Sequence, residues 1–115
     1  MQEQRRAVRY QISFYLRIFN KTTNEAIGHV VDISATGMKI LADRPVAVDT
    51  EYTLFVDLKA ATNFKPEVMF SARCVWVRED PMSGAYNCGF QLVNVTEEQQ
   101  DIINRLIEQF GDQVD

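Results

Sequence analysis

Two polar stretches of this chain contain residue types that can recognise a small anionic ligand. The first, Arg5-Arg6-Ala7-Val8-Arg9, places guanidinium groups four residues apart, and the second is Asp32-Ile33-Ser34-Ala35-Thr36-Gly37. The planar fork of arginine matches phosphate oxygens or the O6 and N7 acceptors of guanine, and its flat face stacks on purines. A carboxylate such as that of Asp32 accepts the two N–H donors on the Watson–Crick edge of guanine. Together the stretches indicate a site that grips phosphates and reads a guanine.

The second stretch also has a purely structural interpretation. Acidic and hydroxyl side chains bond nearby backbone N–H groups and glycine accepts φ > 0, so these residues are typical of a tight turn between two strands. The apolar runs 26–31 and 38–41 on either side fit such strands. In the binding interpretation, Ser34 reaches a neighbouring heteroatom and Gly37 lets a base or ribose approach the backbone. Both interpretations stay open at this point.

Composition limits the class of protein. The chain has 115 residues, 46% hydrophobic and 24% charged, which predicts one globular domain spanning residues 1–115. Its net charge of −4 argues against DNA binding, which needs a broad basic surface. However, the first nine residues carry three arginines and one acid, whereas residues 97–115 carry six acids and one base. A basic arm on an acidic body suits a small anionic ligand.

No stretch of the sequence indicates a membrane. No apolar run approaches the roughly 18 residues of a spanning helix, and the first residues, Met-Gln-Glu-Gln-Arg-Arg, lead into no apolar segment of the secretory type. The sequence therefore predicts a cytoplasmic protein without membrane insertion.

Cysteine and histidine give no sign of a metal site or a catalytic centre. Cys74 and Cys88 match no zinc-ligand spacing and are expected to be reduced thiols in the core. His29, the only histidine, has no adjacent nucleophile or second ligand, so we expect it at a strand surface or partly buried. Because no nucleophile with a base can be assembled, we expect no enzymatic activity, metal or cofactor.

Alternating apolar residues predict six strands after a flexible arm at residues 1–9, within a barrel that spans residues 10–93. The expected strands are 10–19, 26–33, 38–41, 52–58, 68–77 and 86–93. Closure into a small antiparallel β-barrel would remove exposed edges and enclose the inward rows. Strict alternation in the fifth strand puts Trp76 on the inner face with Cys74. Trp76 could instead stack on a ligand base, and Lys39 or Arg73 could add charge there or lie on a solvated barrel wall.

A different pattern predicts one helix over residues 96–110. Thr96 and Gln99 fit a capping box, Glu97 and Glu98 complement the positive end of the helix dipole, and Gly111 stands where the helix would stop. The apolar stripe of this helix falls at Ile102, Ile103, Leu106, Ile107 and Phe110. We expect the stripe to cover one mouth of the barrel, with binding of a partner protein as the alternative.

These features together resemble a known family. The two stretches resemble the RxxxR and (D/N)xSxxG motifs of bacterial PilZ domains, receptors for the second messenger cyclic di-GMP. Residues 72–78, residues 88–92 and the helix start at Thr96 also look like the later strands and terminal helix of that family. The resemblance implies a six-stranded β-barrel with a C-terminal helix and an N-terminal arm that orders over the ligand.

The same resemblance implies roles for individual residues. Arg5 and Arg9 would contact guanine edges, stack on bases and bond phosphates, with Arg6 as an accessory cation. Asp32 and Ser34 would hold a guanine through its polar edge, and Gly37 would shape the surface beneath it. The predicted function is then a cyclic di-GMP receptor that changes conformation to regulate a downstream protein partner. The alternatives are a PilZ-like protein–protein adaptor that binds no nucleotide and, less favoured by the acidic net charge, a single-stranded RNA-binding barrel.

Overall fold

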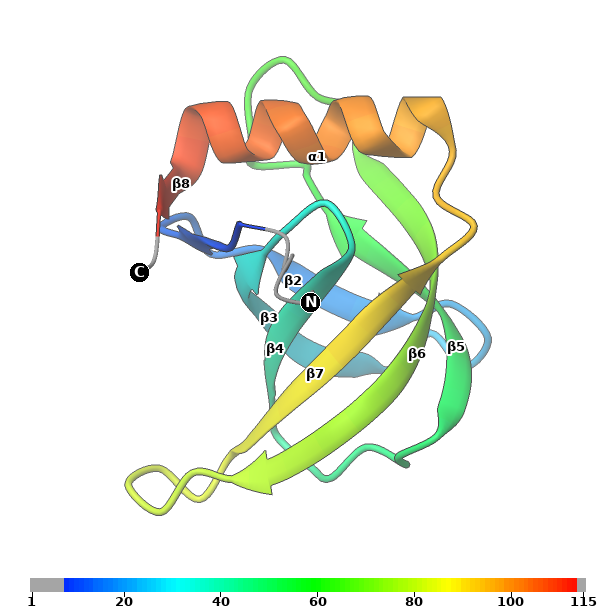
Figure 1. Ribbon diagram of the computed structural model, residues 1–115, viewed down its shortest axis with the longest axis vertical. Helices are drawn as coiled ribbons and strands as arrows, with labels where there is room; N and C mark the ends of the chain where they lie inside the picture. Colours follow the sequence, from blue (N-terminus) through cyan, green and yellow to red (C-terminus); the bar gives the residue numbers. More distant parts are fainter. Residues whose placement is uncertain (1–7, 114–115) are drawn as a thin grey trace, which may run out of the picture.

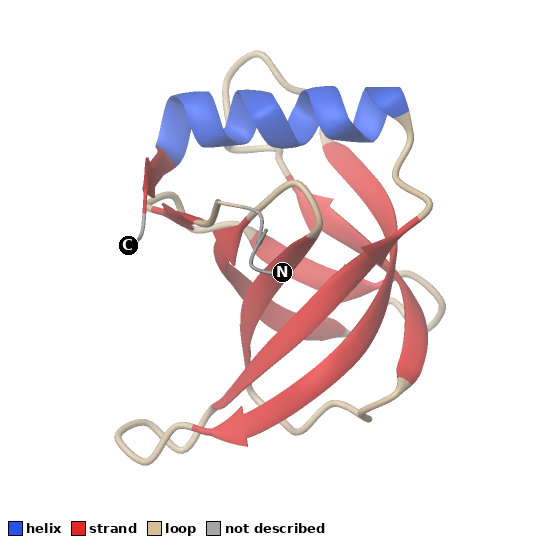
Figure 2. Cartoon of the chain, viewed as in Figure 1, coloured by secondary structure: helices blue, strands red, loops and turns tan. Residues whose placement is uncertain are grey.

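The fold is mainly β, with one helix at the C-terminal end. The structure is a computed structural model that describes residues 8–113. In chain order the elements are β1 (Tyr10–Ile12), β2 (Arg17–Asn20), β3 (Ala26–Ile33), β4 (Gly37–Ala42), β5 (Thr50–Asp57), β6 (Glu67–Glu79), β7 (Tyr86–Val93), α1 (Glu97–Phe110) and β8 (Gly111–Gln113). Figure 2 shows the strands as one curved wall and the helix lying across its end.

The strands form an antiparallel sheet that closes on itself. Their order is β2-β5-β6-β7-β4-β3-β1-β8, and β2 also pairs with β3, so strands β2 to β7 make a closed barrel (Figure 1). Beyond the barrel, β1 pairs with β3 on one side and with β8 on the other. The predicted six-stranded antiparallel barrel with a C-terminal helix is therefore confirmed.

The predicted first strand, residues 10–19, is divided into β1 and β2 by a short break. At the break the backbone N–H and the hydroxyl of Ser13 both donate to the carbonyl of Phe110, each at 3.0 Å. The ring of Phe14 stacks on that of Phe110, with centroids 4.5 Å apart. The chain leaves the ladder here because its polar and aromatic groups bind the end of α1. The inward alternation still holds, since Ile12, Leu16 and Ile18 are buried on either side of the break.

The core lies inside the barrel and follows the predicted alternation. Fully buried side chains come from every barrel strand, as expected when one face of each strand is enclosed. They include Ile18, Val30, Ile40, Leu54, Phe70 and Cys88.

Bulges break the alternation at three places on β3 and β6. Ile27 has no partner on β2, because Ile18 pairs with Gly28 and Phe19 with Ala26. In the same way Val31 is the extra residue opposite β4, and Val75 is the extra residue opposite β7. Each extra residue turns the side chains that follow it to the opposite face.

The prediction that Trp76 lies on the inner face is wrong. The bulge at Val75 means that Cys74 and Val77, three residues apart, both pack against the core, while Trp76 between them faces outward. Trp76 is 36% exposed, whereas Cys74 is 0% exposed. Strict alternation predicts the wrong face because it counts residues and cannot register an extra one.

The helix begins and packs as the sequence predicts. Thr96 and Gln99 form the capping box, with the Gln99 N–H donating to Thr96 Oγ1 at 3.1 Å and the Thr96 N–H donating to Gln99 Oε1 at 3.0 Å. Ile102, Ile103 and Leu106 are buried in the same apolar core as the barrel residues. The helix lies across one end of the barrel in Figure 1. No helical segment within residues 8–113 has the length and apolar character needed to cross a bilayer.

Gly111 follows the last residue of the helix, as predicted, but without the left-handed conformation that glycine often adopts at a helix end. Its φ is −97°, an extended conformation, and the chain continues directly into β8. A Cβ at this position would lie 2.7 Å from the carbonyl oxygen of Ile107. Glycine is therefore required here by the close approach of the last helical turn.

Replacing Ile103 tests how much the helix contributes as a lid. Ile103→Ala removes a side chain that is 0% exposed and should lower the free energy of unfolding by about 2–5 kcal/mol. The neighbouring exposed residue provides a matched control, because Asn104→Ala should change it by less than about 0.5 kcal/mol. Chemical denaturation followed by circular dichroism measures both. If Ile103→Ala and Asn104→Ala both changed the free energy of unfolding by less than about 0.5 kcal/mol, the helix would not be closing the barrel.

The buried thiols should make stability depend on alkaline pH. Cys74 and Cys88 are free and 0% exposed, and burial, with a smaller contribution from Cys74, raises the pKa of Cys88 from 9.0 to about 11. The unfolded thiol ionises first, so the stabilisation is complete below pH 9.0 and is lost as pH rises toward about 11. Denaturant titrations across this range should show a flatter pH dependence in Cys88→Ala than in the wild type. If the stability of Cys88→Ala and of the wild type fell equally with pH, the raised pKa of Cys88 would be contradicted.

Candidate functional site

One row of residues crosses four neighbouring strands on the outer face of the barrel. Asp32 on β3 pairs with Lys39 on β4, Lys39 pairs with Gly89 on β7, and Gly89 pairs with Trp76 on β6. Residues paired in this way point to the same face of a sheet. Gln11 on β1 extends the row on the other side of Asp32. The row therefore joins an acid, a base and an aromatic ring that lie far apart in the sequence.

The bulges at Val31 and Val75 place Asp32 and Trp76 of this row on the outer face. Val30 pairs with the buried Ile40, so unbroken alternation would put Asp32 inside the barrel as well. The extra residue, Val31, turns Asp32 outward and leaves the next residue, Ile33, inside. The bulge on β6 does the same for Trp76.

The row borders a small hollow of about 160 Å³. The residues that line it include Arg9, Asp32, Ser34, Gly37, Lys39 and Trp76. Four of the six predicted site residues, Arg9, Asp32, Ser34 and Gly37, therefore lie together. Arg9 directly precedes β1, Asp32 lies on β3, Ser34 lies in the turn after β3, and Gly37 begins β4. The other two, Arg5 and Arg6, lie outside the described residues.

Asp32 is the most enclosed charged group at the site. Its side chain is 9% exposed, and the ammonium of Lys39 lies 4.0 Å from its Oδ2. That distance is at the outer limit of an ion pair. Within residues 8–113, the pair with Lys39 is the salt bridge found for Asp32. A carboxylate with little access to water gains strongly from N–H donors that a ligand brings to it.

Ser34 holds the turn that positions the site. Its hydroxyl oxygen accepts from the N–H groups of Thr36 at 3.3 Å and Gly37 at 3.1 Å, and its own N–H donates to the carbonyl of Gly37 at 2.9 Å. The N–H of Leu92 fixes the turn to β7 by donating to the carbonyl of Thr36 at 2.9 Å. The turn interpretation of this stretch is therefore confirmed. Ser34 and Gly37 of the turn also line the hollow, and the binding interpretation stays a prediction.

Gly37 does not have the left-handed backbone that the turn interpretation expected. Asn24, Asp49, Asn63, Asn94 and Gly84 are the described residues with positive φ. A Cβ on Gly37 would instead lie 2.6 Å from the carbonyl oxygen of Phe90. Glycine is needed here because β4 and β7 approach closely, and not because of a special φ.

Trp76 lies on the outer face, against the first interpretation of the sequence, and it contacts Gly89, to which the sequence analysis assigned no role. A Cβ on Gly89 would clash with Nε1 of Trp76, so the indole rests directly on the glycine backbone. The guanidinium carbon of Arg78 lies 5.4 Å from the ring centroid, a distance suited to a cation–π contact. The available signal was a glycine inside a strand, which often marks close approach of another group.

A family model and solved structures agree with this architecture. The model described as "PilZ domain" matches residues 3–109. The chain belongs to the PilZ domain family, as the resemblance implied. No curated protein matches the sequence.

Solved structures share the fold at low sequence identity. The PilZ domain of YcgR from Escherichia coli, described as bound to c-di-GMP, has a TM-score of 0.70 and 16% identity over 94% of this chain and 92% of that one. Bacillus subtilis MotI/DgrA, an inhibitor of motility, has a TM-score of 0.71 and 16% identity, covering 94% and 51%. The MrkH–c-di-GMP complex of K. pneumonia has a TM-score of 0.68 and 16% identity, covering 95% and 53%. This chain thus spans about half the length of MotI and MrkH.

The contact between Trp76 and Gly89 can be tested by overpacking. Gly89→Ala should displace the indole and cost about 1–3 kcal/mol of stability, with a shift in the emission of Trp76, the only tryptophan. The cost should shrink when Trp76→Ala is already present, because the clashing ring atoms are gone. Urea denaturation of the two single variants and the double variant measures this coupling. Additive effects would show that the indole does not lie on Gly89.

Proposed function

We propose that this protein is a receptor for cyclic di-GMP, without enzymatic activity, and that ligand binding regulates a protein partner in the cytoplasm. The observation that carries the proposal is the convergence of Arg9, Asp32 and Trp76 on one hollow. These three residues supply a fork for phosphate or guanine, an acceptor for guanine N–H groups and a flat ring. Membership of the PilZ family supports the same ligand, and the relatives YcgR and MrkH are described as c-di-GMP complexes.

Each group at the site has a chemical task in this proposal. Asp32 accepts from the two N–H donors of a guanine edge and so distinguishes guanine from adenine. Arg9 binds a phosphate or the O6 and N7 acceptors bidentately. Lys39 lies 4.0 Å from Oδ2 of Asp32 and lines the same hollow, and its ammonium is proposed to bind a phosphate of the ligand. A base would stack on the indole of Trp76 in place of the Arg78 guanidinium, which lies 5.4 Å from the ring centroid. Such stacking is worth about 1–3 kcal/mol per base.

The size of the hollow indicates how the ligand lies. At about 160 Å³ it is smaller than the roughly 300–1,000 Å³ of pockets that enclose whole drug-sized ligands. One base would occupy the hollow, and the rest of the dinucleotide would lie along the outer face of the sheet. Arg5 and Arg6 are proposed as additional cations for this part of the ligand, with Arg5 paired to Arg9 in the first motif. Ser34 and Gly37 are proposed to act through the shape of the turn.

Variants of the two charged residues test the ligand directly. Arg9→Ala and Asp32→Ala should each weaken binding of cyclic di-GMP about tenfold to a hundredfold, since each loses contacts worth about 1–3 kcal/mol. Asp32→Ala should also reduce the preference for cyclic di-GMP over cyclic di-AMP. Isothermal calorimetry measures both, with circular dichroism to confirm folding.

Arg44→Ala is the matched control, because Arg44 is an exposed arginine outside the hollow. Its affinity should equal that of the wild type. Undiminished binding by Arg9→Ala would remove the argument from the arginine motif. Absence of binding by the wild-type protein would favour the adaptor alternative.

Trp76 gives an independent optical test. Stacking of a guanine on the only indole of the chain should quench or shift its fluorescence during the titration. Trp76→Leu should weaken binding about fivefold or more, because the stacked face is lost. Unchanged emission at saturating ligand would contradict the proposed position of the base.

A further inference from the structure

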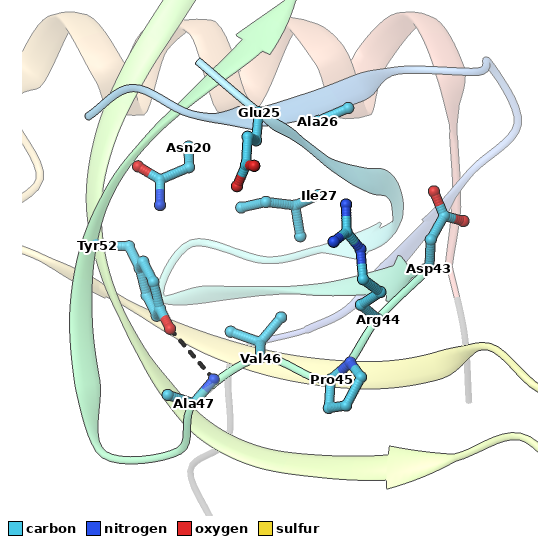
Figure 3. Close-up of a pocket in the computed structure, with 10 residues that line it drawn as sticks. All are labelled: Asn20, Glu25, Ala26, Ile27, Asp43, Arg44, Pro45, Val46, Ala47 and Tyr52. Atoms are coloured by element: carbon cyan, nitrogen blue, oxygen red, sulfur yellow. Dashed lines mark hydrogen bonds between the residues drawn. The ribbon is translucent and has the colours of Figure 1, made fainter. Parts of the chain in front are cut away.

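A second and larger cavity lies away from the candidate nucleotide site. It measures about 390 Å³ and lies between the β2–β3 hairpin and the loop that joins β4 to β5 (Figure 3). That loop runs along the end of the barrel away from α1 (Figure 1). The volume falls within the roughly 300–1,000 Å³ range of binding pockets. Nothing in the proposed nucleotide site uses it.

Both walls of this cavity are held by hydrogen bonds. On the hairpin side the Asn20 N–H donates to the carbonyl of Glu25 at 2.9 Å, and the Thr22 N–H donates to the side chain of Asn20 at 2.9 Å. On the loop side the Asp43 N–H donates to the carbonyl of Ile27 at 3.2 Å, and the Ala47 N–H donates to the hydroxyl of Tyr52 at 3.2 Å (Figure 3). A pre-formed pocket costs a ligand little ordering entropy.

The floor of the cavity is apolar. Ile27 and Val46 are both half-buried, and each packs against the core with one side. Ile27 is the extra residue of the first bulge on β3, so its side chain reaches the cavity instead of following the strand alternation. The ring of Tyr52 closes one side. A half-exposed aliphatic floor of this kind is suited to an inserted apolar side chain.

Charges of opposite sign flank this floor. Figure 3 shows the carboxylate of Glu25 and the guanidinium of Arg44 on either side of Ile27, whereas the carboxylate of Asp43 points away from the centre. The salt bridges found within residues 8–113 do not join Glu25 to Arg44. Pro45 restricts the backbone of Arg44 to extended conformations. Across the cavity, the acid Glu25, the apolar floor and the base Arg44 therefore follow one another in space.

We propose that this cavity is the docking site for a segment of a partner protein in which an apolar residue stands between a basic and an acidic residue. The apolar side chain enters between Ile27 and Val46, the basic residue meets Glu25, and the acidic residue meets Arg44. Charge complementarity on both sides of one apolar anchor selects this occupant over a uniformly basic or acidic segment.

The docking site and the nucleotide site do not overlap. Gly37, the first residue of β4, lines the nucleotide hollow, and Asp43, directly after the last residue of β4, lines the docking cavity. Six strand residues span about 20 Å, so a ligand and a partner can bind at the same time. The proposal therefore goes beyond the proposed receptor function and can be tested without the nucleotide.

Blocked tripeptides titrated into the full, isotope-labelled chain provide the test. The probe is acetyl-Lys-Leu-Glu-amide, and the comparison peptides are acetyl-Lys-Gly-Glu-amide, acetyl-Lys-Leu-Lys-amide and acetyl-Glu-Leu-Glu-amide. We expect the probe to shift the amide NMR signals of Ala26, Ile27, Val46 and Ala47 with an affinity of about 1–10 mM, as suits one side chain in a small pocket. The other three peptides should bind more weakly.

Charge-neutral variants assign the two ends of the segment. Glu25→Gln should weaken probe binding about two- to fivefold and abolish the preference for the probe over acetyl-Glu-Leu-Glu-amide. Arg44→Gln should weaken probe binding to a similar extent and abolish the preference for the probe over acetyl-Lys-Leu-Lys-amide. Glu108→Gln, on the exposed face of α1, is the matched control and should change nothing. Ala47→Phe, at an exposed loop position, should fill the cavity and block the probe while the protein stays folded.

Three results would overturn the proposal. The first is equal binding of the probe and the glycine peptide, and the second is probe shifts that persist in Ala47→Phe. The third is tighter binding of free leucine than of the probe, which would make the cavity a small-molecule site. Because Arg9→Ala should bind the probe normally, failure here is distinguishable from failure of the nucleotide proposal.

Discussion

Two β-bulges control which face of the barrel carries the candidate site. On β3 the extra residue Val31 lets Val30 and Ile33 both face the core while Asp32 faces outward. On β6 the bulge at Val75 lets Cys74 and Val77 both pack inward while Trp76 faces outward. Without these bulges the carboxylate and the indole would both lie inside a closed apolar barrel. Burial of an unpaired carboxylate there would cost several kcal/mol, so the bulges are a condition of the fold as well as of the site.

The fold is largely predictable from local signals because most of its elements obey them. Apolar segments between turn residues give β3, β5 and β7 nearly at their observed bounds, and the capping box marks the start of α1 at Thr96. What local patterns miss depends on tertiary contacts. The break between β1 and β2 exists because Ser13 binds the carbonyl of Phe110, a partner 97 positions away. The three-residue strand β8 forms only because β1 lies beside it.

The candidate site is predictable in its residue types but not in its full membership. Arginine, acid, hydroxyl and glycine at short spacings indicate guanine chemistry, and four of these residues line one hollow. Lys39 and Trp76 join them through strand register, which no single segment of sequence reports. Gly37 shows a different error, since the positive φ that a turn glycine can supply is absent there. The carbonyl of Phe90 excludes a side chain at this position, and the role of Gly37 toward a ligand stays a prediction.

The hollow that contains Asp32 and the helix α1 are connected through one short strand, β1. Arg9 immediately precedes β1, whose Gln11 pairs with Asp32 on one side and with Asp112 of β8 on the other. The next residue after β1, Ser13, is bound to the last carbonyl of α1. A ligand that draws Arg9 toward Asp32 therefore acts on a strand that is hydrogen-bonded to the chain end beyond the helix. Since β1 has only three residues, its position depends on its pairing with β3 and β8 and on the contact of Ser13 with Phe110.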